Sequence, residues 1–328
     1  MRELLIMGVP HEYFKDSSIE AIRAAAEPEF HVTALPADAD SEARCAAIEA
    51  AEVVVGEPKV EELQYAKKLK WLQLTWAGAD RYTAEAERFP KETVLTCATG
   101  AYGITIAEHV MGMLFALCRH IPGYLRDQRI GKHRILSPEK CIYGGTAVIL
   151  GAGDIGWNVA KRLKACGMKT VGVCRTLREL PAEFDEAATL ETVDLTKADV
   201  IVGCLPGTKE TRGWLSRERL ASLKSDAVII NIGRGYLIDC EALTELLQSG
   251  HLFGAGLDVT DPEPLPEEHP LRHMTNVIVT PHVAGVGLGG APITEQLITE
   301  ICCANIGRYL RGETLENRID FATGYKRR

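Results

Sequence analysis

Residues 147–156 read AVILGAGDIG, and this stretch decides the fold of the chain around it. Its apolar start predicts a buried strand, and the residues that follow, WNVAKRLKACG, have helical spacing. A Gly-x-Gly-x-x-Gly turn between a strand and a helix is typical of dinucleotide binding. Gly151 permits the tight turn, Gly153 lets the backbone approach a pyrophosphate, and Gly156 lets the helix pack on the strand. Amides at the start of the helix then face the phosphates; the alternative is a glycine turn without a ligand.

More strands of the same kind follow this turn. Apolar runs alternate with helical patterns, and beyond the strand at 147–150 the predicted strands cover residues 170–174, 200–205, 227–230, 254–259 and 277–280. Six strands with helices between them predict a doubly wound parallel sheet, which is a Rossmann dinucleotide-binding domain.

The chain before this region has a strand–helix alternation of its own. Its predicted strands cover residues 4–7, 30–35, 53–55, 71–74 and 94–96, and its predicted helices cover 18–26 and 41–50. We therefore expect a second doubly wound α/β domain, of the flavodoxin-like kind. A long apolar helix at 105–117 and a polar, extended connector at 126–140 are predicted to lead into the dinucleotide-binding domain.

A last helix, at about 294–311, comes after the second sheet is complete. We expect it to return to the first domain. The predicted organisation is a discontinuous substrate domain of residues 1–101 and 288–328, with a dinucleotide-binding domain of residues 102–287 inserted into it.

Composition narrows the class of protein. The 328 residues carry a net charge of −8 without a dense Lys/Arg run, which argues against nucleic-acid binding. The longest apolar helical stretch, residues 110–118, is far below the roughly 20 residues that cross a bilayer, and the start of the chain lacks a signal-peptide pattern. Ten scattered cysteines are interpreted as small buried side chains in a reducing cytoplasm. We expect a cytoplasmic protein that binds neither nucleic acid nor membrane, and no metal site.

Three polar residues follow predicted strands of the second sheet. Arg234 lies in IINIGRG (229–235), Glu263 lies in DVTDPEP (258–264), and His282 lies in TPHVAG (280–285). Ligands of open α/β sheets bind at the carboxyl ends of the strands. Taken singly, each residue has an ordinary structural alternative: a surface arginine, a solvated acidic loop and a structural histidine.

Together the three residues suit a hydride transfer. Reduction of a carbonyl by a nicotinamide leaves an alkoxide that needs a proton, and His282 can donate one near neutral pH. Glu263 can orient His282 and favour its protonated form, since opposite charges attract. Arg234 can hold a substrate carboxylate with two hydrogen bonds and polarise the adjacent carbonyl.

With these motifs the sequence resembles the D-isomer-specific 2-hydroxyacid dehydrogenases, in particular the glyoxylate and hydroxypyruvate reductases, over nearly its whole length. The matching segments are TWAGAD (75–80), TIAEHVMGMLFALCR (105–119), VILGAGDIG (148–156), CLPGTKETRG (204–213), IINIGRG, GAGLDVTDPEPLP (254–266), TPHVAG and NIGRYLRGETLENRID (305–320). The resemblance implies an NAD(P)-dependent oxidoreductase for small 2-oxo or D-2-hydroxy acids, with Arg234, Glu263 and His282 at the catalytic positions.

The resemblance also implies binding residues. Backbone amides of Gly78 and Ala79 would hold the substrate carboxylate beside Trp76, whose size departs from the family and reshapes the pocket, and Arg234 and His282 would complete that site. Cofactor contacts are expected at Gly151, Gly153, Asp154, Ile155, Gly156, Arg175, Thr176, Leu205, Pro206, Thr211, Ile232, Gly233, Arg234, Asp258, His282 and Gly285. Cys204, beside Leu205, is read as a packed strand residue rather than a reactive thiol. The helix from Thr105 resembles the family's dimer and hinge element, so we expect a homodimer.

The strand TVGVCRT (170–176) bears on the choice of cofactor. An acidic residue at this strand end would bind the ribose 2′-hydroxyl of NAD(H). Here Arg175 can pair with a 2′-phosphate, Thr176 can donate a hydrogen bond, and Arg178 adds positive charge, whereas Glu179 is the one nearby acid. We therefore predict NADP(H) in preference to NAD(H).

Two questions stay open at this level. A dinucleotide-sensing, corepressor-like regulator would share the catalytic trio and is the alternative function. Within the enzyme class, glyoxylate, hydroxypyruvate or a larger 2-oxo acid fits. No basic cluster near TWAGAD supports a phosphoglycerate substrate, and no motif favours formate or phosphite.

Overall fold

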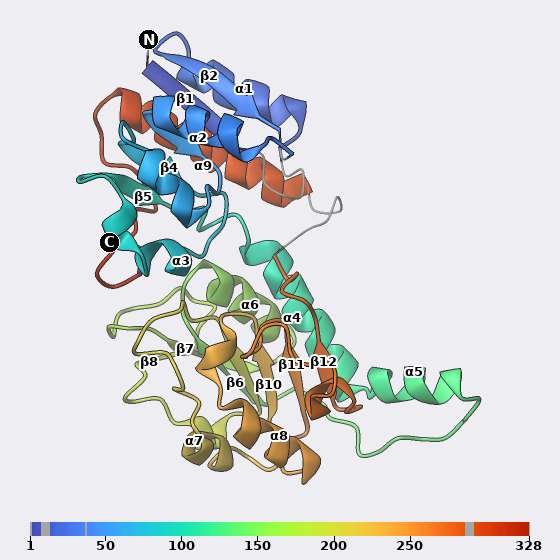
Figure 1. The fold of residues 1–328 in the computed structure, drawn as a ribbon. Coiled ribbons are helices and arrows are strands. Elements are labelled where there is room, and N and C mark those ends of the chain that lie inside the picture. The colour runs from blue at the N-terminus through green and yellow to red at the C-terminus, as the bar shows by residue number, and fades with distance from the viewer. Residues whose placement is uncertain (1, 8–13, 37, 286–291, 328) are drawn as a thin grey trace. The chain divides into compact units, whose positions relative to one another are not determined.

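The computed structural model describes residues 2–7, 14–36, 38–285 and 292–327 (Figure 1). The chain divides into two compact units, one of residues 1–102 with 287–328 and the other of residues 103–286. The predicted boundary between residues 287 and 288 lies outside the described residues.

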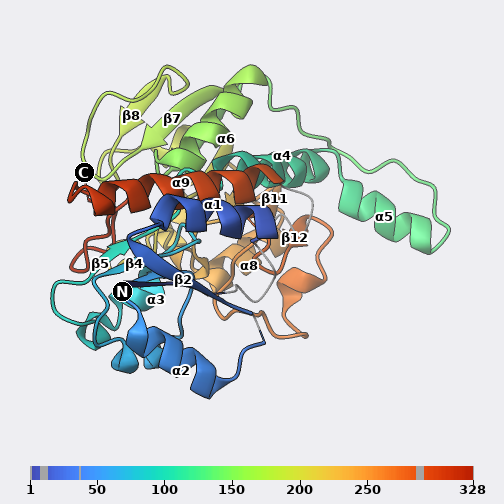
Figure 2. The same cartoon turned by 90° about the horizontal axis from the view of Figure 1, so that it is seen from above.

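The first unit is built on a five-stranded, fully parallel sheet in the order β2-β1-β3-β4-β5. Its strands are β1 (Arg2–Met7), β2 (Phe30–Leu35), β3 (Val53–Val55), β4 (Trp71–Gln73) and β5 (Val94–Thr96). Its helices are α1 (Asp16–Ala26), α2 (Ser41–Ala50), α3 (Asp80–Thr83) and α9 (Pro292–Leu310), with 3-10 turns η1 (Val60–Tyr65) and η2 (Ala86–Arg88). This strand order is the flavodoxin-like order. The predicted last helix is present as α9 and packs beside α1, as Figures 1 and 2 show.

The central strands of this sheet are buried, which explains why the sequence predicts them although they are short. Leu5, Val54 and Leu72 stand side by side on β1, β3 and β4, and each is at most 1 % exposed. Parallel strands covered on both faces read as continuous apolar runs, and branched side chains favour the extended backbone. The indole of Trp71 is buried and donates from Nε1 to Oγ1 of Thr96 at 2.7 Å, so its polar atom is satisfied.

The second unit is built on a seven-stranded parallel sheet in the order β12-β11-β10-β9-β6-β7-β8. Its strands are β6 (Thr146–Leu150), β7 (Lys169–Val173), β8 (Glu186–Ala188), β9 (Val200–Gly203), β10 (Val228–Asn231), β11 (Gly254–Leu257) and β12 (Val277–Val279). Its helices are α4 (Gly103–Cys118), α5 (Ile121–Arg129), α6 (Asp154–Ala165), α7 (Arg217–Ala221) and α8 (Cys240–Gln248), with 3-10 turns η3 (Leu195–Lys197), η4 (Gly235–Leu237) and η5 (Pro270–Arg272). The strand order reverses at β6, and this switch point is where such sheets bind dinucleotides. The predicted α/β class with two doubly wound parallel sheets is confirmed.

Strand β8 was not predicted. It lies at the edge of the sheet and has the sequence EAA, which carries no apolar run because much of it faces solvent. The strand is held by pairing with β7 and by the amide of Cys174, which donates to the carbonyl of Ala188 at 2.9 Å. The predicted strands 200–205 and 254–259 end earlier, at Gly203 and Leu257, where the chain turns into the loops of the site.

The prediction of an extended connector over residues 126–140 is wrong for its first part. Residues 126–129 belong to α5, which starts with Pro122 in its first turn and ends with Arg126 and Arg129. Proline suits a first turn and basic residues suit a last turn, so local preferences outweigh the polar composition. In both views α5 extends away from the seven-stranded sheet (Figures 1 and 2). Within the described residues no single helix is long and apolar enough to cross a membrane, and only α4 and α5 taken together, bent by 65°, have the required length and composition.

The cysteines are only partly the buried side chains that we predicted. All ten are free thiols. Cys97, Cys118, Cys174 and Cys302 are buried, five others are half-buried, and Cys141 is exposed on the segment after α5. Composition does not show which segments are covered, so the prediction is wrong for Cys141.

Candidate active site

The glycine turn after β6 has different requirements at its three glycines. Gly151 has a φ of +111°, and a Cβ there would lie 2.8 Å from the carbonyl oxygen of Cys204. A Cβ on Gly156 would lie 2.0 Å from the carbonyl oxygen of Gly151. A Cβ on Gly153, in contrast, would meet no described atom within 4 Å. The fold thus requires the outer glycines, whereas the space above Gly153, at the start of α6, is open to a ligand.

The end of β7 is joined to this turn. The amides of Gly151 and Ala152 donate to the carbonyl of Val173 at 3.0 and 2.8 Å. Arg175 and Thr176 come after the buried Cys174 and are exposed. Arg178 reaches back and donates from Nη2 to the carbonyl of Ala152 at 3.1 Å. A guanidinium group therefore lies against the glycine turn, on the side where the sequence predicts a phosphate.

Two loops beyond the carboxyl ends of β9 and β10 are packed against each other. A Cβ on Gly233 would lie 2.7 Å from the carbonyl oxygen of Leu205, and the amide of Ile232 donates to Gly203 at 3.0 Å. Thr211 is 1 % exposed, and its hydroxyl donates to the carbonyl of Pro206 at 2.8 Å. The predicted cofactor residues of these loops thus form one continuous edge. Burial raises the pKa of the neighbouring Cys204 thiol to about 12, so this thiol is neutral and unreactive at physiological pH.

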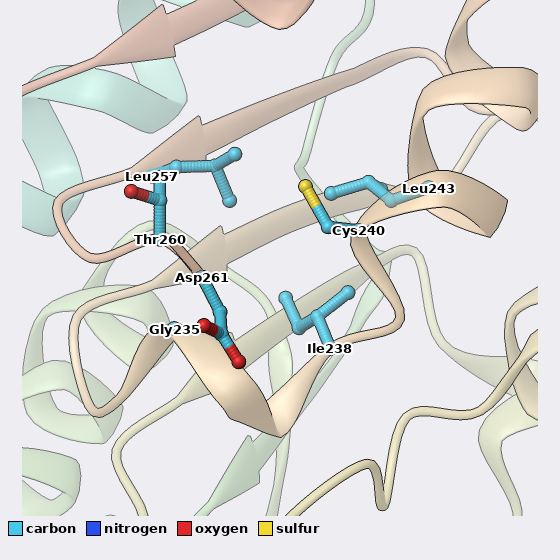
Figure 3. Close-up of a pocket in the computed structure, with 7 residues that line it drawn as sticks. All are labelled: Gly235, Ile238, Cys240, Leu243, Leu257, Thr260 and Asp261. Atoms are coloured by element: carbon cyan, nitrogen blue, oxygen red, sulfur yellow. The ribbon is translucent and has the colours of Figure 1, made fainter. Parts of the chain in front are cut away.

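A small cavity lies behind the loops that follow β10 and β11. Its volume is about 10 Å³, and its lining residues are Gly235, Ile238, Cys240, Leu243, Leu257, Thr260 and Asp261 (Figure 3). This is room for about one water molecule. A Cβ on Gly235 would lie 2.0 Å from the backbone of Thr260, so the cavity is a packing defect between two touching loops and no substrate site.

His282 and Glu263 are brought together by the ends of neighbouring strands β12 and β11. Nδ1 of His282 lies 2.7 Å from Oε1 of Glu263, and the two side chains are 47 % and 42 % exposed. The pair is therefore formed but accessible. Because Nδ1 faces the carboxylate, Nε2 is the imidazole nitrogen left for a substrate.

Arg234 follows β10, the next strand of the same sheet. It is half-buried, and Nη1 donates to the carbonyl of Gly233 at 2.7 Å. Its own carbonyl accepts a hydrogen bond from Nδ2 of Asn231 at 2.9 Å, which anchors the loop. The three predicted catalytic residues thus follow three adjacent strands, and the ion pair between His282 and Glu263 is the contact described among them.

Asp258, which is predicted to contact the cofactor, is a buried carboxylate 2 % exposed. It accepts hydrogen bonds from the amides of Val283 and Ala284 at 2.8 and 2.9 Å and from Oγ1 of Thr280 at 2.6 Å. Its backbone carbonyl accepts from the amide of His282 at 2.9 Å. This aspartate holds the backbone amides of His282 and of the two residues that follow it.

The predicted substrate loop lies in the first unit, after β4. Glu57 accepts hydrogen bonds from the amide of Thr75 at 2.7 Å and from that of Trp76 at 3.3 Å, and Thr75 Oγ1 donates to it at 2.9 Å. Burial raises the pKa of the Glu57 carboxyl, although the bonds from Thr75 act in the opposite direction. Trp76 is 38 % exposed, and the guanidinium of Arg81 lies 5.3 Å from its ring centroid. The loop that carries Gly78 and Ala79 is therefore anchored at its start.

Sequence reasoning assigned no role to Glu57, Thr280 or His109. His109 lies in α4 with Nε2 3.1 Å from Oγ1 of Thr280. Both residues occur in segments that carry the family resemblance, TIAEHV and TPHVAG, but no spacing rule connects two positions so far apart. Among the described residues, no group of three or more His, Cys, Asp or Glu side chains could hold a metal ion.

Comparison with known proteins identifies the family of the chain. The model of the D-isomer specific 2-hydroxyacid dehydrogenase NAD binding domain matches residues 111–284. A glyoxylate reductase of Korarchaeum cryptofilum is 30 % identical over 79 % of this chain and 79 % of its own length.

Solved structures extend the likeness to the whole chain. A D-isomer specific 2-hydroxyacid dehydrogenase family protein of Aeromonas salmonicida is 33 % identical with a TM-score of 0.83, over 98 % of this chain and 99 % of its own. The NADPH-dependent glyoxylate/hydroxypyruvate reductase of Sinorhizobium meliloti, solved with NADP and sulfate, is 27 % identical with a TM-score of 0.78, over 99 % and 100 %. The chain therefore belongs to the D-isomer specific 2-hydroxyacid dehydrogenase family and is an NAD(P)-dependent oxidoreductase of 2-hydroxy acids.

Proposed function

We propose that this protein reduces a small 2-oxo acid to the D-2-hydroxy acid with NADPH, and that Arg234, Glu263 and His282 perform the chemistry. The observation that carries the proposal is the 2.7 Å pair of His282 and Glu263 at the carboxyl edge of a dinucleotide-binding sheet. The glycine turn fits the cofactor, because the space above Gly153 is open and the amides at the start of α6 can face a pyrophosphate. The bound nicotinamide supplies the hydride.

The residues of the chain supply the proton and the charge. His282 donates a proton from Nε2 to the oxygen of the carbonyl as negative charge develops there. Glu263 keeps the imidazole in this orientation and stabilises its positive charge through Nδ1. Arg234 binds the carboxylate and polarises the carbonyl, which lowers the energy of the developing alkoxide. In the reverse direction His282 takes the proton back from the hydroxyl group.

The proposed preference is for NADP(H) over NAD(H). Arg175 and Thr176 follow β7, where no acid stands to repel a 2′-phosphate, and Arg178 donates to the glycine turn itself. Charge-assisted hydrogen bonds of this kind are worth about 1.5–3 kcal/mol each. We expect Arg175→Ala to lower kcat/KM with NADPH by about tenfold or more and to leave that with NADH unchanged. An unaltered preference would refute this assignment.

The proposed substrate class is that of glyoxylate and hydroxypyruvate or a somewhat larger 2-oxo acid. The relatives named above support it, and the amides of Gly78 and Ala79 lie in a loop anchored by Glu57. Trp76 adds an exposed aromatic surface beside that loop, which favours a compact or apolar substituent over a phosphate.

The proposed oligomer is a homodimer in the reducing cytoplasm. Exposed apolar side chains concentrate on α4, α5 and the segment that follows; they are Phe115, Ile121, Leu125, Ile130 and Ile135, which are 43–89 % exposed. Apolar surface gathered in this way favours an interface. Light scattering that showed a monomer would refute the dimer.

A panel assay tests the proposed function. Oxidation of NADPH and of NADH is measured with glyoxylate, hydroxypyruvate and larger 2-oxo acids, for the wild type and for His282→Ala. We expect turnover with the wild type and none with the variant, whose dissociation constant for NADPH is unchanged. Full activity of His282→Ala would remove the proton donor from the proposal, and binding of the dinucleotide without turnover of any 2-oxo acid would favour the regulator instead.

A further inference from the structure

The backbone of His282 has a conformation that needs support. Its φ is +57°, in the left-handed region that residues other than glycine rarely adopt. Such a conformation persists only where the surroundings impose it, and it decides where the imidazole points. The structure shows what imposes it: the amides of Val283 and Ala284 both donate to the carboxylate of Asp258.

The carboxylate of Asp258 is itself fixed from the other side. Oγ1 of Thr280 donates to Oδ1 of Asp258 at 2.6 Å. Thr280 has one hydroxyl proton, and this bond uses it. Nε2 of His109, which lies 3.1 Å from the same Oγ1 and 3.8 Å from Oδ1 of Asp258, must therefore be the donor.

These hydrogen bonds form a continuous series. It runs from His109 through Thr280 to the carboxylate of Asp258, which accepts from the amides that follow His282. His109 is half-buried on α4 and Asp258 is buried, so little water competes for the bonds. Of these hydrogen-bonded residues, only His282 is placed at the reacting atoms in the proposed function.

We propose that Thr280 and His109 are positioning residues for the proton donor His282, acting through the carboxylate of Asp258. This inference rests on the proposed function, in which His282 donates the proton. Loss of either donor frees Oδ1 of Asp258 to rotate, so the amides of Val283 and Ala284 lose their common acceptor. His282 then samples other backbone conformations, and the imidazole spends less time in line with the carbonyl.

The kinetic signature of lost positioning differs from that of lost binding. A displacement of about 1 Å at a reacting group costs up to about 100-fold in rate. Thr280 and His109 are not among the predicted contacts of the cofactor or of the substrate carboxylate, so we expect both affinities to stay constant. Proton donation becomes slower relative to the other steps, so the solvent deuterium isotope effect on kcat rises.

The experiment compares isosteric and conservative variants. Thr280→Val keeps the shape and removes the hydroxyl, whereas Thr280→Ser keeps the hydroxyl. His109→Phe removes the donor, whereas His109→Gln retains an N–H at a similar distance. His251→Phe is the matched control, because His251 is also half-buried and its Nε2 lies 3.2 Å from a backbone carbonyl, that of Leu223, outside the site.

All variants are assayed with NADPH and the best 2-oxo acid of the panel, and their thermal unfolding and NADPH dissociation constants are measured in parallel. We expect Thr280→Val and His109→Phe to lose about 10- to 100-fold in kcat with unchanged KM and NADPH affinity, and to show a larger solvent isotope effect. Thr280→Ser and His109→Gln should regain most of kcat, and His251→Phe should keep it.

Wild-type kcat in both Thr280→Val and His109→Phe would overturn the inference, as would an equal loss in His251→Phe. If Thr280→Val does not fold, the pair His109→Phe and His109→Gln decides: recovery in the glutamine variant supports positioning, and equal kcat in the two overturns it. Activity of His282→Ala, by contrast, would overturn the proposed function itself.

Discussion

Alanine at each of two glycines in the turn after β6 separates what the fold requires from what the cofactor requires. At Gly156 a Cβ would lie 2.0 Å from the carbonyl oxygen of Gly151, about 1 Å inside the 3.0 Å that real contacts respect. The Cβ is fixed by the backbone of residue 156 and the oxygen by the backbone of residue 151, so no side-chain rotation separates the two atoms. Overpacking of this kind costs about 3 kcal/mol, and in a unit of this size it lowers the unfolding temperature by about 6–12 °C.

At Gly153 the expectation is the reverse. Its φ of −94° and ψ of −160° are extended, and a Cβ meets no described atom within 4 Å. Alanine there changes the stability by less than about 1 kcal/mol, because a poorer N-cap offsets the lower entropy of the unfolded chain. The methyl group instead occupies the space that the pyrophosphate needs, and we expect the affinity for NADPH to fall by about 10- to 100-fold, or about 1.4–2.7 kcal/mol.

Two measurements check this pair. Thermal unfolding of the wild type, Gly153→Ala and Gly156→Ala without cofactor reports the steric cost, and a fluorescence titration with NADPH reports the affinity. The reasoning is refuted if Gly153→Ala binds NADPH as the wild type does, or if it loses as much stability as Gly156→Ala.

Three further predictions concern single charged groups. Arg178→Ala should lower the ratio of kcat/KM for NADPH over NADH by about tenfold, since it removes the guanidinium that donates to Ala152; an unchanged ratio in the two-cofactor assay would contradict this. Glu57→Ala should raise KM for the 2-oxo acid by about tenfold and leave NADPH affinity unchanged, because the amide of Thr75 loses its acceptor; steady-state kinetics and a cofactor titration decide. The hydrogen bond from Arg2, with help from Tyr309 and Lys70, lowers the pKa of Glu52 from 4.5 to about 2. The ionised Glu52 therefore stabilises the folded state fully above pH 4.5, and this contribution is lost as the pH falls through 2. With screening at the half-exposed Arg2, Glu52→Gln should cost about 1–2 kcal/mol at pH 7 and nothing near pH 2, as measured by urea unfolding; a cost independent of pH would refute the ionic origin.

Much of the fold was readable because its information is local. The central strands of both sheets, such as Val53–Val55 and Val228–Asn231, are covered on both faces and therefore appear as apolar runs. The glycine turn is equally local, because the positive φ of Gly151 and the close approach of Gly156 to Gly151 both arise within one strand–turn–helix unit. Arg234, Glu263 and His282 were predicted as candidates because each lies in a loop that follows a strand, and parallel strands end at one edge.

Two elements that lack an apolar run were not predicted correctly. The edge strand Glu186–Ala188 has no apolar run, since solvent covers part of it. The helix Ile121–Arg129 is polar and was partly read as an extended connector, although its first and last turns carry ordinary helix signals.

The sequence by itself determined the two-sheet α/β class, the dinucleotide turn and the strand ends that hold the candidate catalytic groups. Only the tertiary structure decided which polar groups meet. Arg178 reaches the carbonyl of Ala152 across 26 residues, and His109 reaches Thr280 across 171. The physical reason is that a hydrogen bond depends on distance and direction in space. Residues on different elements meet only after the sheet has folded, and no pattern along the chain encodes that meeting.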